Sequence, residues 1–345
     1  MTTTSTSAPD EAAARQPARA ERLIDAHVHI VGRGSGGTGC WLRTAWWRGP
    51  FHAWLVRSIG LPLSALRGDL DGLYVERLLE LVRGSSLDAA VILAQEEVYD
   101  ADGHKLTNHG TFHVPNSYVL RLAREHPEFL AGVSIHPARH DALEELDRCV
   151  AEGAVLMKCL PNCQNIDCGD RRYTRFWERM AETGLPLLAH TGGEYTLEVV
   201  RPEYADPRRL VLPLECGVTV IAAHCATRSG LFDPQYFPIF AELTRRFPRL
   251  YGDTSAFLVP NNRSRGAVLA ECLRAPMSDR LIHGSDYPVA VCGHWAWARG
   301  FLPWPVFRRW QRHPNPIERD YQMKLAMGFP VATVSRINAL LPRGA

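Results

Sequence analysis

The sequence lacks long apolar runs, a charge excess of either sign and the cysteine spacing of a disulfide framework. No apolar run approaches the roughly 20 residues that a membrane-spanning helix needs, so no membrane partner is expected. Lys and Arg number 39 against 37 Asp and Glu, and a formal charge of +2 argues against nucleic acid as the main partner. The nine cysteines are odd in number and do not match zinc-ribbon spacing, so reduced thiols in a cytoplasmic protein are expected.

Two further signals are missing. No Gly-x-Gly-x-x-Gly follows the first apolar strand, which argues against a dinucleotide-binding fold. The N-terminal stretch is rich in Thr, Ser and Ala and has no apolar core, which argues against a signal peptide or a membrane anchor. We therefore expect residues 1–21 to form a disordered tail and residues 22–345 to form a single domain.

Short apolar runs recur along the rest of the chain. They are continuous rather than alternating, which is typical of strands that are buried on both faces of a parallel sheet. The expected strands are residues 23–29, 87–93, 129–135, 154–158, 185–190, 218–224, 250–254 and 280–286. Helical spacing is found at residues 73–82, 117–125, 142–151, 173–182, 237–247, 267–273 and from about 317 to 341. Eight such units predict a (β/α)₈ TIM barrel.

A long aromatic insertion is expected after the first strand, at residues 40–73, because ordinary connections are much shorter. Eight of the nine tryptophans lie in this insertion or after the eighth strand. They are Trp41, Trp46, Trp47, Trp54, Trp295, Trp297, Trp304 and Trp310. Because strands one and eight are neighbours in a closed barrel, we expect the two groups to meet at one side of the barrel mouth. They predict either an aromatic wall for an apolar or ring-bearing substrate, or tryptophans that pack on each other or at a subunit interface. A subunit interface would imply a homo-oligomer.

Polar residues end several of the expected strands. His27 and His29 share one face of the first strand because side chains alternate, and two imidazoles at this spacing can bind one metal ion. The carboxyl ends of barrel strands converge on one mouth, so residues at later strand ends should join this pair. The predicted metal site consists of His27, His29, Lys158, His190, His224 and Asp286.

This combination resembles the metal-site signature of the amidohydrolase superfamily, and the resemblance covers roughly residues 22–340. The local sequences at residues 23–29 and 283–288 are most similar to those of the amidohydrolase-related branch, which includes aminocarboxymuconate-semialdehyde decarboxylase. The resemblance implies a barrel that depends on one or two divalent cations. Zn²⁺ suits histidine and carboxylate ligands, and Mn²⁺ or Fe²⁺ is an alternative.

The resemblance also implies a role for each position. His27, His29, His190 and Asp286 would hold the catalytic metal, and Asp286 would also take a proton from the reacting water. His224 would either polarise the substrate or bind a second metal. In physical terms, a divalent cation makes water a nucleophile near neutral pH, and an adjacent carboxylate can act as the general base.

Lys158 is the ambiguous member of the set, because an unpaired ammonium group beside a divalent cation is costly. It could be carbamylated and bridge two metal ions, as in binuclear relatives. It could stay cationic and hold a substrate carboxylate, or it could pair with Asp25, Glu96 or Glu194. Many decarboxylase relatives lack a lysine on this strand, so its presence favours hydrolysis.

The function expected from the sequence is metal-dependent hydrolysis, in which activated water attacks an amide, lactone or ester carbonyl. The alternative is a metal-dependent decarboxylase of an aromatic or enoic acid, and a third reading is a barrel that only binds a ligand. The expected partner is a small molecule, with an aromatic ring or a carboxylate that Arg228 and Arg263 could clamp if they are not simply surface charges.

Other polar residues are assigned supporting roles. Asp253 and Asp25 are candidates to orient a ligand imidazole through a hydrogen bond. Glu194 is a candidate for substrate contact. Five further histidines are expected to be structural or at the surface, namely His104, His109, His113, His136 and His283.

Overall fold

The computed structural model describes residues 21–43, 56–230, 233–260 and 266–342, and its central feature is a parallel eight-stranded sheet. The strand order in the sheet is the same as the order in the chain, so each strand lies beside its predecessor. The strands are β1 (Ile24–His29), β3 (Ala89–Leu93), β5 (Phe129–Val133), β6 (Ala154–Cys159), β7 (Leu187–Ala189), β8 (Val220–Ala222), β9 (Leu250–Asp253) and β10 (Leu281–Ile282). The predicted (β/α)₈ barrel is confirmed.

The segment that follows β10 closes the barrel by running beside β1. Val28 and Tyr287 form a parallel bridge, and the His29 amide donates to the Tyr287 carbonyl at 2.8 Å. The Asp286 amide donates to the His27 carbonyl at 2.9 Å. The closure therefore brings the last predicted strand end directly against the first.

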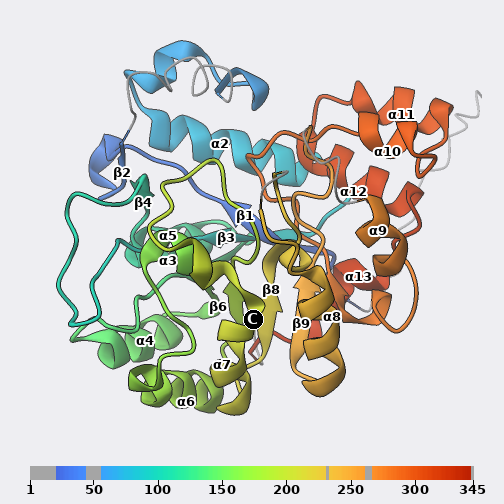
Figure 1. Cartoon of the computed structure of the whole chain (residues 1–345). Helices are drawn as coiled ribbons and strands as arrows, with labels where there is room; N and C mark the ends of the chain where they lie inside the picture. The colour runs from blue at the N-terminus through green and yellow to red at the C-terminus, as the bar shows by residue number, and fades with distance from the viewer. Residues whose placement is uncertain (1–20, 44–55, 231–232, 261–265, 343–345) are drawn as a thin grey trace, which may run out of the picture.

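The helices lie around the strands, as Figure 1 shows. Those of ten or more residues are α2 (Leu70–Arg83), α3 (Asn116–Glu125), α4 (Ala142–Ala151), α6 (Thr174–Thr183), α8 (Phe237–Arg246) and α12 (Pro316–Ala326). Shorter ones are α5 (Pro161–Gln164), α7 (Val211–Glu215), α9 (Gly266–Cys272), α10 (His294–Ala298), α11 (Trp304–Gln311) and α13 (Ala332–Ser335). A two-stranded antiparallel ribbon joins β2 (Trp41–Leu42) to β4 (Phe112–His113).

Both faces of the barrel strands are buried, which explains the continuous apolar runs in the sequence. Side chains on the outer face pack against the helices, in the larger apolar cluster. Side chains on the inner face form a second cluster within the barrel, joined by Ile337 from the C-terminal segment. Its strand members include Ile24, Ala26, Ala89, Val91, Leu93, Leu156, Leu188, Ile221 and Ile282.

The C-terminal region differs from the single helical stretch predicted for residues 317–341. It consists of α12, α13 and a final 3₁₀ turn at Arg336–Ala339. Gly328 adopts a φ of 105°, a left-handed conformation that an α-helix cannot contain, and Pro330 follows closely. Helix α12 begins where the Asn315 side chain accepts from the Ile317 and Glu318 amides, which caps its N-terminus.

Some sequence predictions concern residues outside the described part of the chain. The predicted tail falls almost entirely on residues 1–20, and the middle of the aromatic insertion falls on residues 44–55, which include Trp46, Trp47 and Trp54. Arg263 also lies outside the described residues. In the part of the chain that is described, no helix is long and apolar enough to cross a membrane. The nine cysteines are all free thiols, and subunit association stays a prediction.

Candidate metal centre

Three ligand atoms converge where β1 meets the segment after β10. His27 Nε2 and His29 Nε2 lie 3.1 Å apart, which confirms that the two imidazoles share one face of β1. Asp286 Oδ1 lies 3.2 Å from His27 Nε2 and 3.3 Å from His29 Nε2. All three side chains are largely buried. The arrangement presents two imidazole nitrogens and one carboxylate oxygen to a common point.

The backbone around Asp286 is shaped to reach this point. Asp286 adopts a left-handed φ of 63°, a conformation that Asp tolerates better than most residues. A Cβ on Gly284 would lie 2.7 Å from the Cβ of His27, so only glycine allows the chain to pass so close to β1. Asp25 Oδ1 accepts from the amides of His27 at 3.1 Å and Ser285 at 2.9 Å. Asp25 thus joins the two backbone segments and does not orient an imidazole as predicted.

Asp253, at the end of β9, orients His27 as predicted. His27 Nδ1 donates to Asp253 Oδ2 at 2.7 Å, and both side chains are completely buried. Burial raises the pKa of Asp253, but the charge of His27 and hydrogen bonds lower it further, so the pKa is well below its usual range. The hydrogen bond places the His27 proton on Nδ1 and directs the lone pair of Nε2 to the centre.

His224 lies in a tight turn directly after β8. His224, Cys225 and Ala226 all have φ between 51° and 58°, an unusual left-handed run for residues with a Cβ. The His224 amide donates to Asp253 Oδ1 at 2.7 Å, and its ring stacks on His27 with centroids 5.5 Å apart. One carboxylate, that of Asp253, therefore positions both histidines.

The hydrogen bonds of Ser255 assign the tautomer of His224. Ser255 Oγ donates its single proton to Asp253 Oδ1 and lies 2.8 Å from His224 Nδ1. His224 Nδ1 must therefore carry a proton and donate it, which leaves Nε2 as an acceptor. This protonation state favours a ligand role for His224 over donation to a substrate oxygen. The sequence analysis missed Ser255, although the polar run Asp253-Thr254-Ser255 at a strand end was a usable signal.

His190 follows β7 and is buried in the same region of the barrel. Its ring lies 5.1 Å from that of His224, centroid to centroid, and its Nε2 lies 3.9 Å from Glu194 Oε2. It does not belong to the group formed by His27, His29 and Asp286, whose ligand atoms all lie within 4.8 Å of one another. Within the described ranges its Nε2 has no hydrogen-bond partner. A buried nitrogen without a partner is costly unless a ligand occupies it.

Lys158 enters the barrel from β6, as strand alternation predicts. The side chain is 1% exposed, and Nζ lies 2.8 Å from His27 Nε2. No carboxylate of the described chain lies within 4.0 Å of this amine. Burial lowers the pKa of Lys158.

The ion pairs that the sequence analysis considered for Lys158 are wrong, because each candidate acid has another partner. Asp25 accepts from main-chain amides. Glu96 Oε2 pairs with Arg139 Nη1 at 2.6 Å. Glu194 Oε1 accepts from the Leu197 amide at 3.1 Å, within its own loop.

The protonation states suit cation binding. Burial and the charge of Lys158 lower the pKa of His27 to about 4. Burial also lowers the pKa of His190 and of His224. Burial raises the pKa of Asp286, but the neighbouring imidazoles outweigh it, and the pKa lies well below its usual range. Neutral imidazoles and an ionised carboxylate are the forms that ligate metals, so the group fits a divalent cation with nitrogen and oxygen ligands.

A second group of this type consists of Glu96, Glu97 and His113. Its carboxylates already have cationic partners, because Glu96 pairs with Arg139 and Glu97 pairs with Lys105. Glu97 Oε1 also accepts from the Trp41 indole at 3.1 Å. Among the described residues no Lys or Arg forms an ion pair with Asp286, so the first group is the stronger metal candidate.

The predicted aromatic wall is described only in part. The Trp297 ring of α10 lies 5.0 Å from Trp304 and 5.4 Å from Phe307, both on α11, centroid to centroid. Trp295 packs instead on Phe301, and Trp310 packs on His313. Trp41 stacks instead on His113, with centroids 6.0 Å apart. A substrate-binding role for these rings stays a prediction.

Two histidines predicted to be structural have that role. His136 Nε2 donates to the Gln164 carbonyl at 3.0 Å, and its Nδ1 accepts from the Ala138 amide at 3.1 Å. His283 packs on Tyr321 of α12, with centroids 5.9 Å apart. Both are therefore held outside the group of candidate ligands.

Comparison with known proteins agrees with this geometry. No curated protein matches the chain. An uncharacterized TIM-barrel protein from Bordetella bronchiseptica is 17% identical with a TM-score of 0.57, over 87% of this chain and 99% of that chain. The apo form of Metarhizium anisopliae IDCase is 14% identical with a TM-score of 0.51, over 92% and 96%. Both similarities show the fold.

The amidohydrolase family profile matches residues 24–305, and the chain therefore belongs to the amidohydrolase family.

Proposed function

We propose that this protein is a metal-dependent hydrolase in which water attacks the carbonyl of an amide, lactone or ester. The observation that carries the proposal is the convergence of His27 Nε2, His29 Nε2 and Asp286 Oδ1. A divalent cation at this point would supply Lewis acidity and make water acidic enough to react near neutral pH. Zn²⁺ fits the nitrogen and oxygen donors best, with Mn²⁺ or Fe²⁺ as alternatives.

Residues of the chain are assigned to metal ligation and to proton transfer. His27, His29 and His190 would supply the imidazole ligands, with His27 oriented by Asp253. Asp286 is ionised at the same point, so it completes the ligand set and accepts the proton of the attacking water. His224, whose Nε2 is an acceptor, is proposed as a further ligand.

Lys158 is proposed to carry a carbamate that bridges two ions. A buried amine with no carboxylate partner among the described residues is the form that attacks CO₂. The N–C bond forms, one proton leaves the nitrogen, and the product is an anion that balances added positive charge. We expect metal analysis to show two ions per chain, and Lys158→Ala to hold one or none. Two ions in both proteins would contradict the carbamate.

A carboxylate-bearing substrate is proposed from Arg228, which follows His224 by four residues. Its Nε is buried and has no hydrogen-bond partner within the described chain. A guanidinium group whose buried Nε has no partner within the described chain is suited to a carboxylate, which it can bind through two parallel hydrogen bonds. A homo-oligomer and a location in the cytoplasm are further proposals that rest on the sequence alone.

Product analysis in H₂¹⁸O tests the reaction class. The metal-loaded protein is incubated with a panel of aromatic lactones, N-acyl amino acids and aromatic carboxylic acids. Hydrolysis places ¹⁸O in the new carboxyl group, and Asp286→Asn abolishes this incorporation. Release of CO₂ from an aromatic acid without ¹⁸O in the organic product would instead establish the decarboxylase and overturn the proposal.

A further inference from the structure

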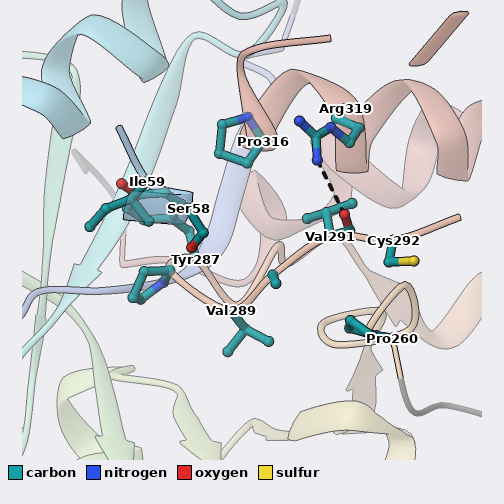
Figure 2. Close-up of a pocket in the computed structure, with 11 residues that line it drawn as sticks. Ser58, Ile59, Pro260, Tyr287, Val289, Val291, Cys292, Pro316 and Arg319 are labelled. Carbon is teal, nitrogen blue, oxygen red and sulfur yellow. Dashed lines mark hydrogen bonds between the residues drawn. The ribbon is translucent and has the colours of Figure 1, made fainter. Parts of the chain in front are cut away.

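A cavity of about 220 Å³ lies against the segment that follows Asp286, outside the candidate metal centre. Figure 2 shows its lining, which combines residues 58–59, the segment from Tyr287 to Cys292 and the start of α12. None of the six predicted site residues lines it. Since one water takes up about 30 Å³ in the liquid, the cavity has room for a small molecule.

Cys292, one of the residues that line the cavity, has an imidazole partner in His294, which is not itself a lining residue. Cys292 is partly exposed, and its Sγ lies 2.8 Å from His294 Nδ1. The His294 ring packs edge-on against Phe307 with centroids 4.9 Å apart, which holds the imidazole in place. The Cys292 amide donates to the Leu258 carbonyl at 2.5 Å, which fixes the backbone beneath the thiol. The imidazole is therefore placed to accept the thiol proton.

A cation without a carboxylate partner lines the same cavity. Arg319 donates to the Val291 carbonyl at 3.2 Å, as Figure 2 shows, and to the His313 carbonyl. It forms no ion pair with a carboxylate of the described chain, and it interacts electrostatically with Cys292. A positive charge and a nearby imidazole are the surroundings in which cysteines become nucleophiles.

We propose that Cys292 is a modification site for small hydroperoxides. His294 accepts the thiol proton, and the sulfur attacks one peroxide oxygen. The S–O bond forms as the O–O bond breaks, and the leaving alkoxide or hydroxide takes the proton from His294. The sulfur is oxidised by two electrons to a sulfenic acid, and the hydroperoxide is reduced to an alcohol or water. This proposal goes beyond the proposed hydrolysis and requires neither substrate nor metal.

The chain contains a matched control. Cys216 is the other partly exposed cysteine, whereas the remaining seven are buried. Burial raises the pKa of the Cys216 thiol. No imidazole within the described residues forms a hydrogen bond with it, so its reactivity measures exposure without activation.

Competitive labelling of the purified, metal-loaded protein tests the proposal. In one arm iodoacetamide is added in limiting amount, and in the other hydrogen peroxide is added with dimedone, which traps sulfenic acids. Peptide mass spectrometry then gives the extent of modification at each cysteine. We expect Cys292 to be modified at least about tenfold faster than Cys216 in both arms, because Cys292 has an imidazole within 2.8 Å that can accept its proton.

Two variants separate activation from exposure. His294→Ala, at an exposed residue, should reduce the rate at Cys292 to near that of Cys216, and His104→Ala, also exposed, should leave it unchanged. Equal rates at the two cysteines, no dimedone adduct on Cys292, or an unchanged rate in His294→Ala would each overturn the proposal. Because the readout is the thiol itself, a failure here is distinguishable from a failure of the proposed hydrolysis.

Discussion

The carboxylate of Asp253 fixes two of the candidate ligands at once. Oδ2 accepts from His27 Nδ1, and Oδ1 accepts from the His224 amide and from Ser255. Each imidazole consequently presents its Nε2 lone pair to the centre without needing the metal to select the tautomer. The site is thus largely organised by hydrogen bonds that lie behind the ligands.

Asp253→Asn should reduce metal affinity about 10- to 100-fold, the usual effect of removing the carboxylate behind a metal-bound histidine. The amide has one acceptor oxygen, and its NH₂ group cannot accept the His27 proton. A competition titration of Zn²⁺ against a chromophoric chelator measures the change. Asp147→Asn, at a surface residue paired with Arg179, is the control. Equal affinity in wild type and Asp253→Asn would show that Asp253 does not organise the site.

At the scale of elements, helix α12 supports the segment that carries Asp286. Lys324 Nζ donates to the Gly284 carbonyl at 2.8 Å and to Asp320 Oδ2 at 2.5 Å. Lys324 and Asp320 are almost completely buried, which is rare for charged residues. Burial raises the pKa of Asp320 to about 7, and Lys324 opposes this increase. The pair links the C-terminal helix to the turn beside His27.

Lys324→Met should destabilise the metal-free protein by about 3–5 kcal/mol, because it leaves Asp320 buried without its partner. The double variant Asp320→Leu/Lys324→Met should recover a large part of this loss, since no uncompensated charge stays in the core. Urea unfolding of the three proteins measures the free energies. If the double variant were as unstable as the single one, the loss would not come from the uncompensated carboxylate.

The sequence predicted the elements better than their ends. All eight strands were predicted, because strands buried on both faces are continuous apolar runs. The strand predicted at residues 218–224 ends at Ala222, because His224 begins a left-handed turn that Asp253 stabilises from another strand. The helices α10 and α11 were missed, and α10 spans only five residues, which is too short to show a helical period.

The candidate site was predictable where it depends on strand ends and was not where it depends on partners distant in the sequence. The pairing of His27 with His29 follows from strand alternation alone. The partner of Lys158 could not be chosen from the sequence, because three nearby acids were equally plausible until their other contacts were known. Lys324 lies on α12, 40 residues after the Gly284 carbonyl to which it donates a hydrogen bond, so no local sequence pattern reveals this contact.

At the scale of the whole molecule, buried imidazoles dominate the expected pH dependence of stability. Burial lowers the pKa of His27 and of His136 to about 4 from an ordinary value of 6.5. Between these values the unfolded chain binds more protons, so stability is lost as the pH falls from about 6.5 to 4. Three more buried histidines have lowered pKa values, namely His190, His224 and His283.

Two buried carboxyls act in the opposite direction. Burial raises the pKa of Asp25 to about 6 and that of Asp320 to about 7, so the folded state binds the extra protons there. Because the histidines outnumber them, the free energy of unfolding of the metal-free protein should fall between pH 6.5 and 4.5. Urea unfolding at several pH values measures this dependence. A constant or rising stability over the same window would contradict it.

The proposed chemistry requires a divalent cation bound between β1 and the segment after β10. The most direct measurement is an anomalous difference map, collected at the zinc absorption edge from crystals grown with Zn²⁺. We expect a peak in contact with His27 Nε2, His29 Nε2 and Asp286 Oδ1. No peak at this position, or a peak only among Glu96, Glu97 and His113, would contradict it.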